Sequence, residues 1–292
     1  MEVSHPMLQL WIPFITITVV LFGFGQVFTK TGVTRLGLPR MVLLLAINMA
    51  FFYGGAYMIF HEDTPVPLKG IGLSMLSTFM ASIGYIFYYE AVNRERISIV
   101  GVITAAYPFI TVILAVLFLQ EPPTSFQFFA VILIIISVSL LSHTRHRKSR
   151  DENSSPENRL WLVYAFISIV IWGIQAVVAK ASITLVGHFT YVGVYAIMGP
   201  VTLIPYWYMK DRTFSFSRKD IQAEISVSFF CLGGIFLYTA FQYGLVSIIT
   251  AFSNLYPFIT LIVARIFLSE HMETHHWIAV ALALGGIVLL MG

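Results

Sequence analysis

Tyr107-Pro108-Phe109-Ile110-Thr111 occurs a second time in the chain as Tyr256-Pro257-Phe258-Ile259-Thr260, at an offset of 149 residues (256 minus 107). In the same register, each residue from 88 to 121 can be compared with the residue 149 positions later, and 14 of these 34 pairs are identical. Nearer the start, Gly23 and Lys30 match Gly173 and Lys180 at an offset of 150. A nearly constant offset over this length indicates that the chain consists of two related halves.

The composition is that of an integral membrane protein. Hydrophobic residues make up 58% of the 292 residues and charged residues 11%, whereas a soluble domain carries about 25% charged residues. The apolar runs are continuous and do not alternate with polar residues, which predicts membrane-spanning helices and not a β-barrel. We expect a multi-pass protein of the cell membrane with spans at about 8–29, 39–59, 70–92, 97–119, 126–142, 160–180, 190–208, 222–244, 247–268 and 275–291.

A polar stretch from His143 to Asn158 lies near the middle of the chain. We therefore expect a first five-helix repeat in residues 1–143, a basic linker in 144–158 and a second five-helix repeat in 159–292. Because five is odd, the second half enters the membrane in the opposite sense, an arrangement typical of secondary transporters. The predicted fold class is all-α, with ten transmembrane helices as two inverted five-helix repeats around a central cavity.

The basic residues are unevenly divided between the two ends of these spans. Of the 17 Lys and Arg residues, 14 fall in loops on one side, two (Lys69 and Lys180) on the other, and Arg265 near a span end. Positively charged loops stay in the cytoplasm, which predicts that both termini lie outside it and the central linker inside. The net charge of +3 is modest, and the basic residues lie in loops, so no nucleic-acid partner is expected.

The repeated Tyr-Pro pair lies in the middle of the fourth and ninth spans. Pro108 and Pro257 each remove a backbone hydrogen bond and disturb the carbonyl four residues back, which belongs to Thr104 or Ser253. Such carbonyls at membrane depth need a partner from protein or water. We expect two helix kinks that line a central cavity. The alternative is that both kinks are tolerated features of helix packing and do not line a cavity. The residues expected beside the kinks are Tyr107, Asn254 and Tyr256.

Polar and aromatic residues in other spans are further candidates for contact with a substrate. Glutamines are costly in lipid and should point inward, although they can equally bond between helices. Lys180, near a span end, is expected to extend toward the interface. The additional candidate substrate-binding residues are Gln26, Tyr85, Tyr89, Glu90, Trp172, Gln175, Tyr238 and Gln242.

Glu90 is the only carboxylate expected within a span, and an acid at that depth is a candidate proton carrier. Arg94 follows it at the i+4 position, so an ordinary surface ion pair is the competing interpretation, and the one we favour. The histidines 271, 275 and 276 raise the alternative of a membrane-embedded metalloenzyme, but they occupy a short loop without other polar support. We expect no metal, no cofactor and no enzyme activity; the sequence contains no P-loop or zinc-protease motif.

The order and double occurrence of these motifs resemble the EamA family of the drug/metabolite transporter superfamily. The segments that carry the resemblance are Gly23 with Lys30, Trp172-Gly173 with Lys180, 255–260, 264–270 and 277–290, and the first half repeats the pattern at 107–121. The resemblance implies ten helices around a cavity lined by spans one, three, four, six, eight and nine. It also implies alternating access and transport of metabolites such as amino acids, often outward. Glu121 and Glu270 match the family's Leu-Gly-Glu-like signature, in which Gln120 and Ser269 here replace the usual glycine, and we interpret both glutamates as structural. Ten-span relatives generally keep both termini in the cytoplasm, opposite to the orientation that the loop charges predict.

From these features we expect a secondary transporter for a small neutral or zwitterionic metabolite, acting around a midplane site. Its expected partners are the substrate, the lipid bilayer and protons as a candidate coupling ion, and the chain is expected to be a monomer or homodimer. A substrate-binding sensor that kept the fold without transport is an alternative that the residues leave open.

Overall fold

The computed structural model describes residues 10–61, 65–95, 97–141, 160–213, 215–268 and 274–291. Within these ranges the chain is all-α and contains no strand, so the predicted helical class is confirmed. The helices before the central linker are α1 (Trp11–Leu36), α2 (Leu38–Asn48), the π-helical turn η2 (Met49–Tyr53), α3 (Gly54–Phe60), α4 (Leu68–Arg94), α5 (Ile97–Thr104), α6 (Tyr107–Leu114), the π-helical turn η3 (Ala115–Leu119) and α7 (Ser125–Leu141). Those after it are α8 (Leu160–Val186), α9 (His188–Lys210), the short 3-10 turn η5 (Arg218–Asp220), α10 (Ile221–Tyr243), α11 (Val246–Ser253), α12 (Tyr256–Leu268) and α13 (Thr274–Met291).

Six helical segments are long and apolar enough to cross a membrane, which confirms the prediction of several spanning helices. They are α1, the continuous run from α2 to α3, α4, α8, α9 and α10. The other four predicted spans appear among the described residues as shorter apolar segments. Large apolar side chains such as Met58 (81% exposed) and Phe118 (73% exposed) face outward, as expected of a surface in contact with lipid.

The fourth and ninth predicted spans are interrupted helices and not single continuous ones. Helix α5 ends at Thr104 and α6 begins at Tyr107, while α11 ends at Ser253 and α12 begins at Tyr256. Each proline therefore occupies the second position of a new helix, where its missing N–H leaves no intrahelical bond unmade. The turn before α6 is closed by tight bonds, with the Phe109 amide donating to the Ala106 carbonyl at 3.1 Å.

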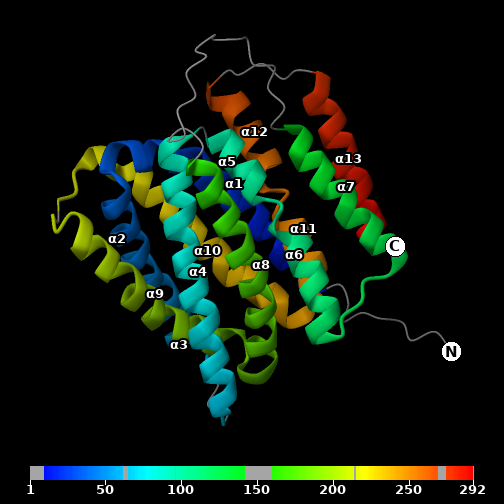
Figure 1. The fold of residues 1–292 in the computed structure, drawn as a ribbon, viewed down its shortest axis with the longest axis horizontal. Helices are drawn as coiled ribbons and strands as arrows, with labels where there is room; N and C mark the ends of the chain where they lie inside the picture. Colours follow the sequence, from blue (N-terminus) through cyan, green and yellow to red (C-terminus); the bar gives the residue numbers. More distant parts are fainter. Residues whose placement is uncertain are drawn as a thin grey trace.

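The main helix pairs join segments from opposite halves of the chain. Helix α1 packs along α10, α4 along α8, and α7 along α13; Figure 1 shows the α7–α13 pair on one flank and α2, α3 and α9 on the other. Hydroxyl pairs bond across two of these contacts, Thr29 to Ser226 at 2.9 Å and Ser74 to Ser182 at 2.5 Å. Small polar residues let membrane helices approach closely and bond across the interface. The core therefore lies between the halves.

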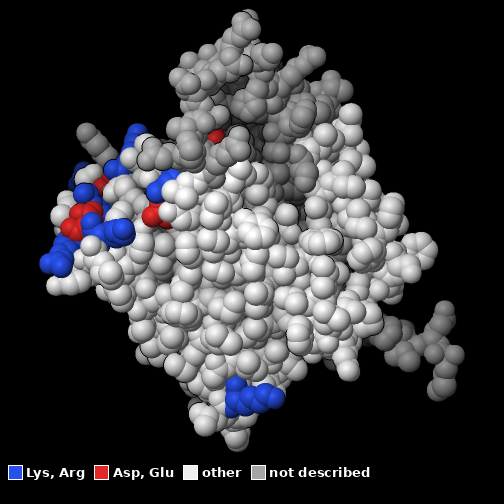
Figure 2. Space-filling model, in the orientation of Figure 1, with Lys and Arg blue, Asp and Glu red and all other residues white. Residues whose placement is uncertain are grey.

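On the face of the molecule that Figure 2 draws, described charged residues cluster at one end. Figure 2 shows Lys, Arg, Asp and Glu beside α2 and α9, a broad uncharged belt, and a separate basic patch at the opposite tip, where α4 begins. Lys69 is the second residue of α4 and is exposed. The uncharged belt is the surface that a bilayer would cover.

The start of α2 and the end of α9 are joined at the charged end by Asp211. Its carboxylate accepts from the Thr213 hydroxyl at 2.5 Å and from Arg40 Nε at 2.8 Å. The pKa of Asp211 lies below its usual value. The hydrogen bond from Thr213 is the larger cause, and the hydrogen bond from Arg40 is the next. Both bonds favour the charged carboxylate in the folded protein.

The stability of the purified protein is expected to fall on acidification in part through Asp211. Because the pKa of Asp211 is lower in the folded protein, the stabilisation that Asp211 gives the folded state is fully present above the ordinary carboxyl pKa of about 3.9. This stabilisation is lost as the pH falls below that value. Thermal melting in detergent should therefore decline less steeply with acid for Asp211→Asn than for the parent. Thr213→Val, which removes only one of the bonds, should lie between them. Three identical acid profiles would contradict this assignment.

Candidate functional site

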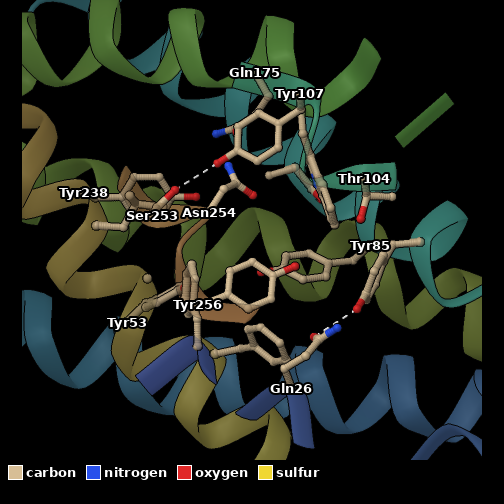
Figure 3. Close-up of a pocket in the computed structure, with 17 residues that line it drawn as sticks. Gln26, Tyr53, Tyr85, Thr104, Tyr107, Gln175, Tyr238, Ser253, Asn254 and Tyr256 are labelled. Carbon is tan, nitrogen blue, oxygen red and sulfur yellow. Dashed lines mark hydrogen bonds between the residues drawn. The ribbon is translucent and has the colours of Figure 1, made fainter. Parts of the chain in front are cut away.

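A cavity of about 90 Å³ lies where the interrupted helices meet α1, α4, α8 and α10 (Figure 3). That space suits a few water molecules, so a larger occupant requires the helices to separate. Its walls come from both halves of the chain. The lining residues are Phe22, Gln26, Tyr53, Ala81, Tyr85, Tyr88, Thr104, Tyr107, Trp172, Gln175, Phe230, Gly234, Leu237, Tyr238, Ser253, Asn254 and Tyr256.

Trp172 is the centre of an aromatic wall on one side of the cavity. Its ring lies 5.4 Å from Tyr85, 5.4 Å from Tyr88 and 6.3 Å from Tyr107, measured between centroids. The contacts to Tyr85 and Tyr107 are edge-on, at interplanar angles of 70° and 73°, the geometry that aromatic quadrupoles favour. The indole also lies directly over Gly84, where an added Cβ would be 2.3 Å from its Nε1 atom. The ring position is therefore tightly determined.

The opposite wall is built on Phe22 of α1. Its ring lies 5.4 Å from Phe230 and 6.3 Å from Tyr256. A Cβ added at Gly233 would lie 2.6 Å from this ring. Phe22 therefore packs over Gly233 in the same way as Trp172 packs over Gly84, and the two pairs occupy equivalent positions of the repeat. Two large rings from matching positions face the cavity from different sides.

The amides at the cavity are held in place by neighbouring polar groups. Gln26 accepts a hydrogen bond from the Tyr88 hydroxyl at 3.0 Å, and Asn254 Nδ2 donates to the Thr250 carbonyl at 2.8 Å. Gln175 Nε2 donates to the Ser77 hydroxyl at 3.1 Å. Gln175 Nε2 also donates to the Tyr191 hydroxyl at 3.2 Å. These bonds fix the orientation of the three amides at the cavity.

The two helix interruptions open onto this cavity. Thr104 and Tyr107 flank the first interruption and Ser253 and Tyr256 the second, and all four line the cavity. The Tyr107 hydroxyl lies 3.3 Å from the Ser253 hydroxyl, so the two interruptions touch (Figure 3). Irregular backbone at membrane depth is typical of substrate sites in transporters, where helix termini and free carbonyls face the ligand.

None of the described residues that line the cavity carries an ionisable acid or base, apart from the tyrosine phenols. An ion with net charge would lose its hydration there without gaining a counter-ion. Among the described residues no group of three or more His, Cys, Asp and Glu could hold a metal. The side chains of histidines 271, 275 and 276 lie outside the described residues.

Eight of the residues singled out from the sequence line the cavity, namely Gln26, Tyr85, Tyr107, Trp172, Gln175, Tyr238, Asn254 and Tyr256. Three others do not. Tyr89 is fully buried, and its hydroxyl has no hydrogen-bond partner among the described residues. Gln242 Oε1 is likewise buried and makes no hydrogen bond to the described part of the chain. Glu90 forms an ion pair with Arg94 and accepts from the Tyr206 hydroxyl at 3.0 Å.

Tyr53 and Tyr88 also line the cavity, although neither was among the candidate substrate-binding residues. Tyr88 and Tyr89 lie three and four residues after Tyr85, and both positions share a helix face with it, so helical spacing did not distinguish them. Tyr53 lies in the π-helical turn η2 and reaches the cavity beside Gly234, where an added Cβ would be 2.3 Å from its hydroxyl. No pattern in the second span indicates this role.

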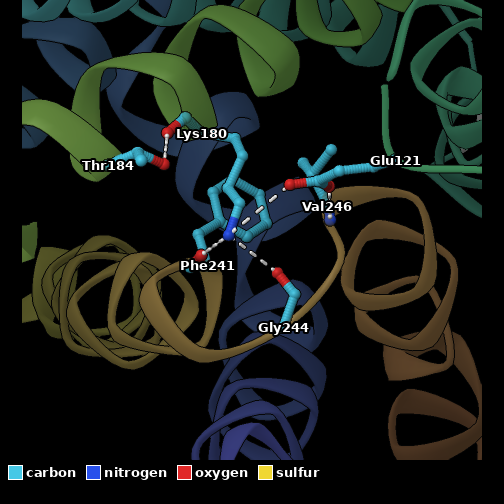
Figure 4. Close-up of polar contacts among 6 residues, drawn as sticks. All are labelled: Glu121, Lys180, Thr184, Phe241, Gly244 and Val246. Carbon is cyan, nitrogen blue, oxygen red and sulfur yellow. Dashed lines mark hydrogen bonds and ion pairs between the residues drawn. The ribbon is translucent and has the colours of Figure 1, made fainter. Parts of the chain in front are cut away.

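Lys180 does not extend to the interface, contrary to the prediction. It is 9% exposed, and its ammonium donates to the carbonyls of Phe241 and Gly244 (Figure 4). The wrong expectation came from treating a lysine near a span end as free to reach water. The packing of α8 against α10 and α11 instead encloses the side chain.

Comparison with known proteins gives three kinds of similarity. The model of the EamA-like transporter family matches residues 9–143 and again residues 159–292. Over 192 residues the chain is 25% identical to "Uncharacterized transporter SLY41" of Saccharomyces cerevisiae, covering 62% of this chain and 42% of that protein. Over 74 residues it is 38% identical to "Uncharacterized protein MJ1333.1" of Methanocaldococcus jannaschii, covering 25% of this chain and 54% of that one. The chain thus spans about half the length of these relatives.

A solved structure titled "Crystal structure of protein" has the same fold. It superposes with a TM-score of 0.68 over 94% of this chain and 96% of its own, at 14% sequence identity. At that identity the similarity concerns the fold alone.

Proposed function

The chain belongs to the EamA-like transporter family, and from this premise we propose that it is a secondary transporter. It moves a small neutral or zwitterionic metabolite through the central cavity by alternating access, in the direction of export. The observation that carries the proposal is an uncharged aromatic cavity placed where two interrupted helices, one from each half, touch. A midplane site between broken helices is the arrangement that secondary transporters use.

The proposed architecture is ten helices in two inverted five-helix repeats, residues 1–143 and 159–292, joined by the linker 144–158. Matching contacts between the halves support it. The Thr260 hydroxyl donates to the Gly23 carbonyl at 3.1 Å, and the Thr111 hydroxyl to the Gly173 carbonyl at 3.3 Å. Thr111 and Thr260 are repeat mates at offset 149, as are Gly23 and Gly173 at offset 150. Each half therefore binds the other through equivalent residues.

The polar groups of the cavity suit a ligand with hydrogen-bonding groups and an apolar body. Aromatic faces can hold an ammonium, while amide and hydroxyl groups bond a carboxylate or carbonyl. A net anion such as a phosphate ester finds no cationic side chain among the described lining residues. This supports amino acids and related neutral compounds as the substrate class. The cluster of charged residues at one end of the face in Figure 2 supports an orientation with that end in the cytoplasm.

A transport screen tests the proposal. A host that lacks its own exporters should gain resistance to toxic amino acids or related compounds, and the purified protein in liposomes should exchange the same compounds. The variant with Tyr107, Tyr256 and Asn254 all replaced by alanine is expected to lose this transport. If that variant transports as well as the parent, the cavity is not the substrate site.

Glu90→Gln is the companion variant for proton coupling. Because Glu90 is bonded to Arg94 and Tyr206 outside the cavity, transport is expected to persist in the variant, along with any dependence on the proton gradient. Loss of gradient dependence in Glu90→Gln alone would instead assign the coupling proton to this carboxylate.

A further inference from the structure

Lys180 is a buried cation with three oxygen partners. Its Nζ atom donates to the Phe241 carbonyl at 2.6 Å and to the Gly244 carbonyl at 3.0 Å, and it lies 3.8 Å from Glu121 Oε1 (Figure 4). The Phe241 carbonyl lies in the last turn of α10 and the Gly244 carbonyl directly after it, so both are at the end where the helix dipole is negative. Only 11% of the lysine side chain is exposed. Burial of an ammonium is costly unless such partners are present.

Glu121 completes the same cluster from the other side of the turn. Its Oε2 atom accepts from the Val246 amide at 3.2 Å, and Val246 is the first residue of α11. The carboxylate thus faces the positive end of α11 while the ammonium faces the negative end of α10. Together the two side chains hold the turn between these helices.

The cluster joins the two halves of the chain. Glu121 follows η3 in the first half, whereas Lys180, α10 and α11 belong to the second. Any motion that separates the halves at this point must break the contact of Glu121 with Lys180 and with Val246. The charges would then need water, which is available only if that end of the molecule opens.

The position of Lys180 along α8 shows which end this is. Lys180 precedes the end of α8 at Val186, and Val186 packs on Gly70 at the start of α4, where an added Cβ would lie 2.3 Å from it. The exposed Lys69 is therefore at the same end, opposite the charged end. On the inner side, Trp172 of the cavity wall lies eight residues back, about 12 Å along the helix.

We propose that Lys180 and Glu121 form a latch that closes the cavity at the Lys69 end and opens once in each transport cycle. They are positioning residues, because they act on the α10–α11 turn and do not touch the cavity. The proposal rests on the proposed alternating access. In the sequence, Lys30 and Glu270 occupy the positions of the repeat that match Lys180 and Glu121; the Lys30 side chain and Glu270 lie outside the described residues.

Sided labelling of a cysteine in the cavity tests the latch. The chain has one cysteine, Cys231, so Cys231→Ser gives a cysteine-free background. In it, Leu237→Cys places a thiol on the half-buried cavity wall. A membrane-impermeant thiol reagent is applied to whole cells and to inverted membrane vesicles. A separate Lys69→Cys variant identifies which preparation exposes the Lys69 end.

The latch predicts slow labelling of position 237 from the Lys69 end in the parent. Lys180→Met and Glu121→Gln should each label roughly tenfold faster from that end, which corresponds to about 1.4 kcal/mol. Glu121→Gln keeps an oxygen for the Val246 amide and so protects folding if Lys180→Met does not fold. The matched control is Lys69→Met, which removes an exposed lysine of the same end and should label like the parent.

The latch is wrong if well-folded Lys180→Met and Glu121→Gln label at the parent rate, or faster only from the charged end. It is also wrong if Lys69→Met accelerates labelling equally, because the effect would then be one of general charge. Labelling needs no substrate, so these outcomes do not depend on whether any compound is transported. Conversely, a correct latch in a protein that moves no tested compound would count against the proposed transport alone.

Discussion

Trp172→Ala is expected to abolish ligand binding in the cavity and to lower the free energy of unfolding by about 3 kcal/mol. The indole is in ring contact with Tyr85, Tyr88 and Tyr107, and its Nε1 atom donates to the Ala81 carbonyl at 3.4 Å. Alanine would leave a void between α4, α6 and α8 and would free three tyrosine rings to turn. Binding to the purified protein, measured by calorimetry with a compound found in the transport screen, checks the first effect. Denaturant unfolding checks the second.

Two further variants separate the loss of the site from the loss of stability. Trp172→Phe keeps an aromatic ring over Gly84, as Phe22 does over Gly233 in the other half, and should retain most of the stability while binding more weakly. Trp277→Ala makes the same change at a residue that is 58% exposed on α13 and should leave binding unchanged. Undiminished binding in Trp172→Ala would exclude the aromatic wall from the site.

Gly173→Val should destabilise the packing of α8 on α6 by more than any substitution at an open glycine. A Cβ at Gly173 would lie 2.6 Å from Ile110 Cβ and 3.2 Å from the Tyr107 carbonyl. The helices would have to separate, and the Thr111 bond to the Gly173 carbonyl would be lost. Overpacking of a tight contact costs about 1–3 kcal/mol, and a contact that includes backbone has little room to relax.

The equivalent glycine in the first half provides a second measurement of this destabilisation. A Cβ at Gly23 would lie 2.4 Å from Ile259 Cβ, so Gly23→Val should destabilise to a similar degree. Gly72→Val is the control, since nothing lies within 4 Å of a Cβ at Gly72 on the exposed face of α4. The measurement is thermal unfolding in detergent. Equal melting temperatures for all three valine variants would contradict the close approach of the halves.

Helical spacing and the internal repeat predicted eight of the residues that line the cavity. Gln26, Gln175 and the Tyr-Pro pairs were found because polar groups in apolar runs are rare and because the same positions recur in both halves. Tyr89 was selected in place of Tyr88, since both lie on the side of α4 that bears Tyr85. Spacing alone could not distinguish them. The choice depends on how α4 rotates against α1 and α8, where Gln26 meets Tyr88.

For the charged residues Glu90 and Lys180, too, the sequence could indicate local partners but not partners on distant helices. The ion pair of Glu90 with Arg94 was the interpretation that the sequence favoured, because its partner is local at i+4. The additional bond from Tyr206 is not local and could not be seen. Lys180 was misjudged because all its partners lie on α10, in the turn after it, or in the segment after η3.

By itself the sequence determined that the chain consists of apolar helices, that its halves are related, and that each half carries a Tyr-Pro in an apolar span. These properties follow from composition, from identity at constant offset and from the missing N–H of proline, all of which are local. Only the tertiary structure decided which rings face the cavity, that Tyr53 reaches it, and that Lys180 is enclosed. Those outcomes depend on the rotation and contact of helices distant in sequence, where a single turn separates a cavity wall from a buried or lipid-facing surface.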